Sequence, residues 1–255
     1  MDQRAAADLI KSLIAQTVRG APTVMRYREP LVAFAAAEDP RFRDLRAIVG
    51  PGHMLPHDLL PGARSVISFF LPFSPDIPES NAASRAAVSR EWTLAYTESN
   101  ALLARIKRDL TEKLAAVGVR AAGTPPTGQF DRKTLLSSWS HKSVAVIAGL
   151  GSFGVHHMVI TEAGCAGRLG SLVVDVDLPV NAAPPVVRCT FFREGGCLEC
   201  VARCPVGALD ERRGIDRHLC CDRCLAAAQE DASLGAHVCG KCATGPCAVL
   251  PRVFP

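Results

Sequence analysis

The sequence has few of the features that mark membrane, nucleic-acid-binding or exported proteins. Aromatic residues make up 5% of the 255 residues, and no eighteen apolar residues follow one another without interruption, so we expect no membrane span. The net charge is only +4, and the chain has no basic run and few rings on which bases could stack, so nucleic-acid binding is not expected. Residues 1–20 contain neither a twin-arginine pair nor a signal-peptide layout and are typical of an amphipathic helix, which indicates a cytoplasmic protein.

Cysteine is unevenly placed in the chain. Ten of the eleven cysteines fall between Cys189 and Cys247, and only Cys165 lies outside this tract. Because a reducing cytosol does not sustain disulfides, such crowding indicates metal binding. The tract also has few large apolar side chains, so we expect bound metal to organise it.

The chain before the cysteine tract alternates segments with helical and strand-like patterns. Residues 64–73 predict a buried strand, and residues 91–118 predict a long helix because apolar residues recur at helical spacing up to a glycine. Residues 140–151 predict a second helix that stops at glycine, and residues 156–178 predict two strands around a turn. We therefore expect an α/β or α+β fold with at least three strands.

A proline-rich stretch separates the two parts of the chain. Residues 179–188 are typical of a linker, and the apolar periodicity fades beyond them. We expect two domains: residues 1–185 would hold a cofactor or substrate, and residues 186–255 would hold the metal.

The spacing of the first cysteines in the tract matches part of a known metal-binding run. The spacing of Cys197, Cys200 and Cys204 with Pro205 matches the last three ligands and the proline of a ferredoxin-type run. In such a run the final cysteine binds the neighbouring cluster. Glu194 occupies the position of the expected first ligand, so Cys189 is the nearest candidate to replace it.

Crossing the two halves of the tract in ferredoxin fashion predicts two 4Fe-4S clusters. The predicted ligands of the first cluster are Cys189, Cys197, Cys200 and Cys247. The predicted ligands of the second cluster are Cys204, Cys220, Cys239 and Cys242. Either Cys221 or Cys224 can replace Cys220 in this assignment. The competing interpretation is one or two zinc sites on the CxxC pairs, because tetrahedral thiolate zinc uses the same spacing.

Several segments resemble a known family. The tract contains CTFFREGGCLECVARCPVGAL, GIDRHLC and CGKCATGPC, and it resembles the double-cluster domain of epoxyqueuosine reductases and, more distantly, of reductive dehalogenases. A second segment, residues 138–178, resembles the stretch that precedes the clusters in this family. Its sequence is SWSHKSVAVIAGLGSFGVHHMVITEAGCAGRLGSLVVDVDL. The resemblance implies a nitroreductase-like corrinoid-binding domain with base-off cobalamin. It also implies a ferredoxin-like domain that follows it, whose two 4Fe-4S clusters feed electrons to the cobalt.

Two features set this sequence apart from epoxyqueuosine reductase proper. It lacks the helical-repeat extension that the family associates with its tRNA substrate. The family's aspartate-threonine-glycine-proline motif is not visible either, and the nearest text is PPTGQFD. We therefore expect a substrate other than epoxyqueuosine.

The resemblance also implies which residues surround the corrinoid. They are Ser140, His141, Gly149, Gly151, Ser152, Phe153, Gly154 and Arg168. The stretch GLGSFG fits the dinucleotide pattern GxGxxG, but its glycines close a helix and precede a strand, the reverse of the order that a nicotinamide site needs. Such glycines otherwise mark a helix end or a tight turn. Arg168, in the turn AGRLG, is either an anion-binding residue or an exposed hairpin arginine.

Three residues are candidates for proton transfer or substrate binding: His141, Asp131 and Tyr96. His141, at a helix start, can donate a proton or bind a propionamide arm, or it can be an ordinary polar residue of the helix terminus. Asp131 can act as an acid if an apolar pocket raises its pKa, and a solvated loop carboxylate is the alternative. Tyr96 can donate to a substrate or pack in the core with its hydroxyl satisfied.

Three more residues next to these segments are not expected to react. His156 and His157 are neighbours on a predicted strand and would point to opposite faces, which argues against a paired-histidine metal site. Cys165 has no assigned histidine or basic partner, so we expect a small, semi-buried residue rather than a nucleophile.

These expectations combine into one predicted function. We predict an iron-sulfur oxidoreductase that takes single electrons from a ferredoxin or flavodoxin and passes them through two clusters to a base-off corrinoid, which reduces a small-molecule substrate. One alternative is an electron-transfer or corrinoid-reactivating partner protein without its own substrate. The other is a flavin-dependent reductase on the same fold.

Overall fold

The centre of the protein is a four-stranded antiparallel sheet with the strand order β1-β2-β6-β3. The computed structural model describes residues 2–126, 129–180, 186–231 and 233–250. The strands are β1 (Leu31–Ala36), β2 (Ser65–Pro72), β6 (Gly167–Val174) and β3 (Ala121–Gly123). Ile67 of β2 pairs with Phe34 on one side and with Leu172 on the other, so three apolar side chains from neighbouring strands enter the same layer of the core.

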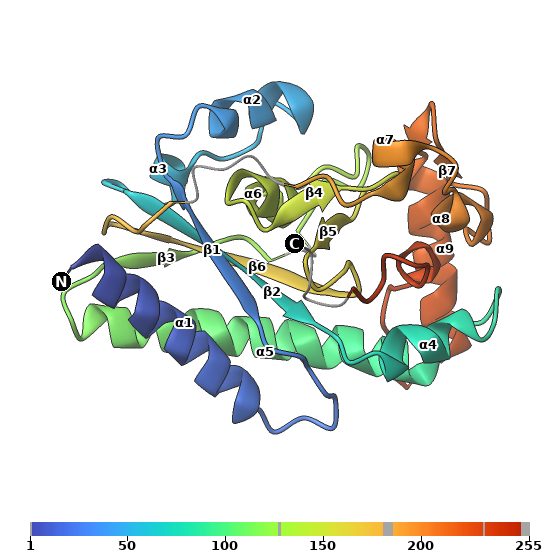
Figure 1. Ribbon diagram of the computed structural model, residues 1–255, viewed down its shortest axis with the longest axis horizontal. Coiled ribbons are helices and arrows are strands. Elements are labelled where there is room, and N and C mark those ends of the chain that lie inside the picture. Colours follow the sequence, from blue (N-terminus) through green and yellow to red (C-terminus); the bar gives the residue numbers. More distant parts are fainter. Residues whose placement is uncertain (1, 127–128, 181–185, 232, 251–255) are drawn as a thin grey trace.

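Helices cover both faces of this sheet (Figure 1). On one face lie α1 (Gln3–Arg19) and α5 (Arg90–Ala115). On the other face lie α2 (Arg41–Ile48), α3 (Pro56–Leu59) and α6 (His141–Ile147). Because β2 is central and covered on both sides, all of its residues are buried, which explains its continuous apolar run.

The longest helix, α5, follows directly from the sequence pattern. The Ser89 side chain accepts the Trp92 N–H at 3.2 Å and so caps the helix N-terminus. Leu103, Ile106 and Leu110 recur every three or four residues and are buried in the core layer shared with α1. The predicted long helix and the predicted buried strand β2 are confirmed, as is a mixed fold with at least three strands.

A small hairpin lies beside α6. It consists of β4 (Gly151–Phe153) and β5 (Val159–Thr161). A Cβ atom at Gly151 would lie 2.3 Å from the carbonyl oxygen of Ile160, so only glycine allows the two backbones to come this close.

The cysteine tract folds into short elements at one end of the sheet, beside α4 (Asp76–Ala82) (Figure 1). They are α7 (Thr190–Glu194), α8 (Glu199–Ala202), β7 (Leu209–Asp210), β8 (Gly214–Ile215), α9 (Arg217–Glu230) and the 3₁₀ helix η1 (Lys241–Ala243). Helices α7 and α8 contain no buried residue, and α9 buries only Ala227. This end of the molecule therefore has little apolar core of its own.

The cysteine tract shares a hydrophobic cluster with the first part of the chain. Phe73 and Trp92 pack there with Ala243 and Ala248. Gly240, at φ +69°, lies so close to Trp92 that a Cβ atom would come within 2.1 Å of the indole ring. The two parts thus meet through packed side chains. The predicted division near residue 186 stays a prediction, and residues 181–185 of the predicted linker lie outside the described residues.

Backbone hydrogen bonds also join the last cysteine to the segment before β6. The Cys165 N–H donates to the Cys247 carbonyl and the Ala166 N–H to the Ala248 carbonyl, each at 2.9 Å. Gly164, at φ +96°, leaves room for this segment, because a Cβ atom there would lie 2.3 Å from the Ala248 oxygen. The end of the tract is therefore fixed against the sheet domain.

Two local predictions are wrong. His156 and His157 lie in the turn between β4 and β5 instead of on a strand, since His157 has φ +57° and the strand begins only at Val159. Arg168 lies within β6 instead of in the turn, because the left-handed Gly164 completes the reversal before it. Among the described helices, none is long and apolar enough to cross a bilayer.

Candidate functional site

Three cysteines, one of them 47 residues away in the sequence, lie near Cys200. Burial, followed by the charges of Cys247, Cys189 and Cys197, raises the pKa of the Cys200 thiol to about 11. Thiolates that destabilise one another in this way are stabilised together by a metal cation, which keeps coordinating thiols deprotonated. These four residues are the predicted ligands of the first cluster.

A second set of cysteines surrounds Cys242. Burial raises the pKa of Cys242, and the charges of Cys220, Cys239, Cys200 and Cys204 raise it further. Apart from Cys200, these residues are the predicted ligands of the second cluster. Because Cys200 belongs to the first set and acts on Cys242, the two sets adjoin.

The two spare cysteines of α9 differ in position. A hydrogen bond from Cys224 lowers the pKa of Cys220 to about 7. One helical turn separates these two residues, and the charge of Cys221 also acts on Cys224, so all three cysteines lie near one another. The charges that act on Cys242 include that of Cys220, which favours Cys220 as the ligand. The choice among the three cysteines stays a prediction.

A histidine and a buried cysteine contact the last predicted ligand of the first cluster. Nε2 of His156 lies 3.3 Å from Sγ of Cys247, and Sγ of Cys165 lies 3.9 Å from the same sulfur. Nδ1 of His156 accepts the N–H of Met158 at 3.1 Å, so the ring proton is on Nε2 and points to the sulfur. His156, Cys165 and Cys247 lie within 4.8 Å of one another by their ligand atoms.

These contacts favour the thiolate form of Cys247. Hydrogen bonds from Cys165 and His156 lower the pKa of Cys247 to about 5 against the opposing effect of burial, while the hydrogen bond to Cys247 and burial raise the pKa of Cys165. Cys165 is 1% exposed, so the predicted semi-buried residue is in fact fully buried, and it has a histidine close by. The sequence does not reveal His156 as a neighbour of Cys165, because only the geometry of the turn brings His156 close to Cys247 and Cys165.

Next to Cys165 lie two cavities that meet at His141 and Leu169. The larger one, of about 500 Å³, is lined on the α5 side by Tyr96, Asn100 and Lys107. The smaller one, of about 190 Å³, is lined by Met158, Cys165 and Arg168, among others. The cavities therefore extend from α5 to the residue that touches Cys247.

The predicted residues Arg168 and Tyr96 lie together in these cavities. The Arg168 guanidinium carbon is 4.3 Å from the centre of the Tyr96 ring, a cation-π contact. Nη2 of Arg168 donates to Oδ1 of Asn100 at 2.6 Å, and Nε is buried without a hydrogen-bond partner. A buried, unused donor on a cation suits a ligand with carbonyl, amide or anionic groups.

Lys107 is a candidate that sequence reasoning missed. Its Nζ donates to the Thr124 carbonyl at 3.3 Å and to the Thr124 hydroxyl at 3.1 Å. Burial lowers the pKa of Lys107 to about 8, which makes it an acid that can give up a proton near neutral pH. The helical spacing of Tyr96, Asn100 and Lys107, which puts them on one face of α5, is the signal that could have found it.

His141 is held neutral by its surroundings. It is 7% exposed, and its ring nitrogens lie 2.9 Å from Oγ of Ser171 and 3.2 Å from the Pro125 carbonyl. Because a carbonyl only accepts, Nε2 carries the proton and donates it to Pro125. Burial, followed by the charge of Lys107, lowers the pKa of His141 to about 3. The only ring proton of His141 is thus already donated to the Pro125 carbonyl. The predicted role of His141 as a proton donor gains no support from this geometry.

The other predicted cofactor residues lie away from these two cavities. Ser140 caps α6 by accepting the Ser143 N–H at 3.2 Å, and Gly149, at φ +82°, follows the end of α6. Oγ of Ser152 accepts the Arg188 N–H at 3.2 Å. Together with Gly151, whose role is in the hairpin, these residues have structural duties that need no ligand.

A separate pocket of about 520 Å³ lies between α6 and the cysteine tract. Ser140, Phe153 and Gly154 line it together with Lys142 and Arg217. Of the residues predicted to surround the corrinoid, these three line this pocket and two, His141 and Arg168, line the cavities near Lys107. The remaining three, Gly149, Gly151 and Ser152, line neither.

Asp131 lies in neither place. Its carboxylate accepts the N–H groups of Lys133 and Thr134, at 3.0 and 2.7 Å, and the Thr134 hydroxyl at 2.8 Å. These hydrogen bonds lower the pKa of Asp131, so it stays ionised. A proton donor needs a raised pKa, and the surroundings of Asp131 favour the alternative of a solvated loop carboxylate.

The residues present fit the cofactors that the sequence resemblance implies. All eleven cysteines are free, and eight of them form two adjoining sets of sulfur donors, which is the donor chemistry of 4Fe-4S clusters. The larger cavity combines apolar walls with a few polar groups and has the size usual for small-molecule sites, and the smaller one, which Cys165 lines, shares His141 and Leu169 with it. The unpaired Nε of Arg168 is available to the polar periphery of a corrinoid.

The sequence comparison identifies relatives. No family model matches the chain. Epoxyqueuosine reductase of Salmonella typhimurium is 31% identical over 166 residues, which are 65% of this chain and 40% of that protein. The enzyme of the same name from Escherichia coli is also 31% identical over 166 residues, 65% of this chain and 41% of that protein. The chain is therefore similar in sequence to the epoxyqueuosine reductases. It spans about two fifths of the length of these curated relatives.

Solved structures share the fold of this protein. Epoxyqueuosine reductase of Bacillus subtilis matches with a TM-score of 0.54 and 16% identity, over 97% of this chain and 66% of that one. A reductive dehalogenase, described with a mechanism for B12-dependent dehalogenation, matches with a TM-score of 0.54 and 15% identity, over 80% of this chain and 25% of that one. The resemblance and the mixed fold predicted from the sequence are confirmed.

A third structure bears on nucleic acid. It shows epoxyqueuosine reductase with an epoxyqueuosine-modified tRNA stem loop, and it matches with a TM-score of 0.52 and 19% identity, over 86% of this chain and 58% of that one. Because a relative with the same fold is seen with RNA, our expectation of no nucleic-acid binding is not supported. A low net charge was too coarse a criterion, because it averages over the whole surface.

Proposed function

We propose that this protein is an oxidoreductase that passes single electrons through two 4Fe-4S clusters to a base-off corrinoid. The observation that carries the proposal is that the predicted cluster ligands and the cavities adjoin one another. The two sets of thiols adjoin, and Cys165 links the last cysteine, 3.9 Å away, to the wall of the cavities.

Each set of thiols would hold one cluster. The first would bind Cys189, Cys197, Cys200 and Cys247, and the second would bind Cys204, Cys220, Cys239 and Cys242. When bound, the clusters supply electrons one at a time and the corrinoid supplies a cobalt centre that takes them up. A ferredoxin or flavodoxin suits this site as the donor, since both carry single electrons.

The side chains around the cavities have distinct tasks in this proposal. His156 and Cys165 donate to the Cys247 sulfur and keep it a thiolate. Arg168 binds a polar group at the edge of the cofactor through its unpaired Nε. Lys107 delivers the proton that a reduced substrate takes up.

The reducible group of the substrate enters the larger cavity beside Lys107. It belongs to a small molecule in our primary hypothesis. The alternative is a modified nucleoside within tRNA, because a structural relative is seen with a tRNA stem loop. Competition by an unmodified stem loop separates the two, since it would slow turnover only if the chain binds RNA.

The test is anaerobic reconstitution of the full chain with iron and sulfide, followed by titration with cob(II)alamin and electron paramagnetic resonance. We expect about eight iron atoms per chain, as two 4Fe-4S clusters require, and a stoichiometric base-off cobalt signal. Replacing Cys200 or Cys242 by alanine should remove about half of the iron, whereas replacing Cys221 should leave the iron content unchanged.

Three results would count against the proposal. Zinc in place of iron would restore the competing metal assignment. Two intact clusters without cobalamin binding would favour a flavin enzyme or an electron-transfer partner protein. A cobalamin-loaded protein that never converts a substrate in multiple turnovers would favour a corrinoid-reactivating partner.

A further inference from the structure

A buried lysine lies between two predicted ligands of the second cluster. Lys241 follows Cys239 and precedes Cys242 in the stretch CGKC, and it is only 2% exposed. Lysine is almost never fully buried unless its charge is paired or hydrogen-bonded. Its position therefore calls for a specific function.

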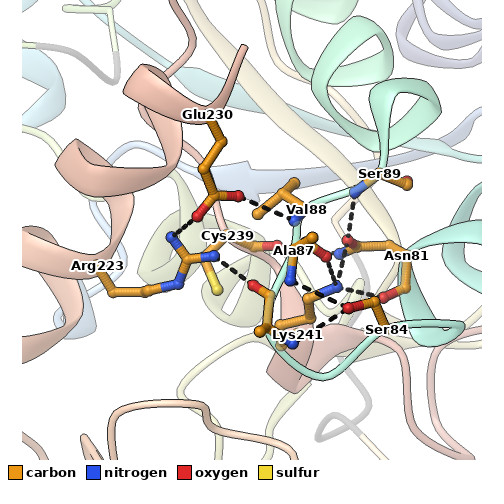
Figure 2. A network of polar contacts seen from close by, with 10 residues as sticks. Asn81, Ser84, Ala87, Val88, Ser89, Arg223, Glu230, Cys239 and Lys241 are labelled. Atoms are coloured by element: carbon orange, nitrogen blue, oxygen red, sulfur yellow. Dashed lines mark hydrogen bonds and ion pairs between the residues drawn. The ribbon is translucent and has the colours of Figure 1, made fainter.

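All three hydrogen atoms of the Lys241 ammonium group have an acceptor (Figure 2). Nζ donates to the carbonyl oxygen of Asn81 at 2.6 Å, to Oδ1 of Asn81 at 2.9 Å and to the carbonyl oxygen of Ala87 at 2.6 Å. Three acceptors and no donor fit the protonated amine, which has three donors and no lone pair. Lys241 is thus a buried cation.

Within the described residues, no carboxylate accepts a hydrogen bond from Lys241. All of its acceptors are neutral amide oxygens from α4 and from the loop that leads to α5. The neighbouring Arg223, in contrast, forms an ion pair with Glu230 at 2.8 Å (Figure 2). The charges of Arg223 and, less strongly, of Lys241 both lower the pKa of Cys239 against the larger effect of burial, and of these two cations only Lys241 lacks a hydrogen-bonded carboxylate.

The same contacts fix the ligand loop in place. Nδ2 of Asn81 donates to the Cys239 carbonyl at 3.0 Å, while Oδ1 of Asn81 accepts the Ser89 N–H at 3.1 Å. Asn81 is 0% exposed, so these bonds form in a low dielectric where they are strong. The position of the charge relative to Cys239 and Cys242 is thereby set by the sheet domain.

We propose that Lys241 is a positioning residue that raises the reduction potential of the second cluster. The inference rests on the proposed function, since it needs a cluster on Cys239 and Cys242. Reduction transfers one electron from the external carrier to the cluster, and no bond forms or breaks. A fixed positive charge stabilises the added electron, so the cluster nearest Lys241 is the easier one to reduce.

The test is a potentiometric titration of the reconstituted full chain, followed by electron paramagnetic resonance. We expect Lys241→Met to shift the reduction equilibrium of one cluster at least tenfold toward the oxidised form, which is about 59 mV for one electron. Lys241→Arg keeps the charge and should restore most of the potential. Lys113→Met, which removes an exposed lysine of α5, is the matched control and should shift neither cluster.

A second variant allows the same test if the Lys241→Met protein loses its iron. Asn81→Asp leaves the ammonium group in place but sets a carboxylate against it, so it should lower the same potential. The protein with Cys200→Ala, which lacks the first cluster, shows which signal belongs to the second.

The outcomes separate the two proposals. Wild-type protein that holds no iron-sulfur cluster overturns the proposed function. Two intact clusters whose potentials stay unchanged in Lys241→Met and in Asn81→Asp overturn the role of Lys241 alone. An equal shift of both clusters in Lys241→Met also overturns it, because a fixed local charge acts most strongly on the nearer cluster.

Discussion

Lys107 and His141 line the same cavity, but burial leaves them in different charge states at neutral pH. The pKa of Lys107 is about 8 and that of His141 about 3, so the lysine is charged and the histidine is neutral. Each charge state suits the neighbouring acceptors, a hydroxyl and a carbonyl for Lys107 and a carbonyl for His141. The mobile proton of this cavity is therefore on the lysine.

Replacing Lys107 by methionine should lower the turnover of the loaded enzyme by roughly 10² to 10⁴, the usual contribution of a positioned general acid. Wild-type activity should fall as the pH rises through about 8, because Lys107 then loses its proton. Steady-state rates between pH 6 and 10 check both statements. Lys113→Met is the control on the same helix, and equal rates for Lys107→Met and wild type would exclude the role.

The lowered pKa of Lys107 also makes the stability of the fold depend on pH. Unfolding returns the lysine to its ordinary pKa, near 10.5, so between about pH 8 and 10.5 the unfolded chain binds more protons than the folded one. Stability should therefore rise with pH in this window and stay level below it. Urea unfolding of wild type and Lys107→Met at several pH values isolates the effect. A rise of the same size in both proteins would contradict it, because the cysteines titrate in both.

The residues of the site differ in how far the sequence could reveal them. Cysteine spacing is local, so it predicts the two ligand sets and Cys204 as the crossing ligand, and these stay predictions. The helical spacing on α5 could have pointed to Lys107, but not to the burial of its ammonium group. Lys241 and His156 could not be found, because their partners lie far away in sequence and meet them only in the folded protein. The surroundings of Asp131 depend on loop geometry that composition does not encode.

At the scale of single elements, the hairpin of β4 and β5 depends on one close backbone approach. It carries His156 in its turn, and through that residue it reaches Cys247. The sequence shows the glycines of this stretch but not why glycine is needed there, because GLGSFG also fits a ligand-binding loop. The reason for Gly151 lies in the partner strand, where the Ile160 carbonyl leaves no room for a side chain.

Gly151→Ala should destabilise the protein by roughly 1 to 3 kcal/mol, the usual cost of forcing an extra methyl group into a packed site. Thermal unfolding checks this, with an expected fall in Tm of a few degrees per kcal/mol for a domain of this size. Gly123→Ala is the matched control, because it lies in β3 with nothing within 4 Å of the added Cβ atom, and should stay within about 0.5 kcal/mol of wild type. Equal Tm values for the two variants would contradict the argument.

At the scale of the whole molecule, the sheet domain and the cysteine tract meet through a shared core. Phe73 and Trp92 pack against Ala243 and Ala248. The Cys165 N–H also donates a hydrogen bond to the Cys247 carbonyl. The composition of the chain predicted two parts, because apolar residues thin out where cysteines begin. It could not predict the packing between them, which depends on contacts such as that of Gly240 with Trp92.

Removing the metal should loosen the tract and the part of the sheet domain that touches it. After chelation of a reconstituted sample, we expect amides of α9 and η1 to lose protection from hydrogen exchange, because the tract has little core of its own. Cys165 and Ala166 should lose protection with them, since their N–H groups are bonded to Cys247 and Ala248.

The central strand β2 is the internal reference in the same exchange experiment. It is buried on both faces and should stay protected when the metal is gone. If the tract keeps full protection without metal, side-chain packing alone holds it together. If β2 exchanges as fast as α9, the two parts unfold as one unit.

The crossed arrangement of the cysteines has a consequence for how the protein is made. On the proposed ligand sets, the first cluster needs Cys189 and Cys247, and the second needs Cys204 and Cys242. A ribosome releases the early cysteines well before the late ones, so the second cluster cannot be completed until residue 242 has emerged, nor the first until residue 247 has. The sheet domain, including the segment around Cys165, is synthesised earlier and can serve as the template on which the last cysteine is placed. Assembly of the metal centres would then follow the folding of the residues before the tract.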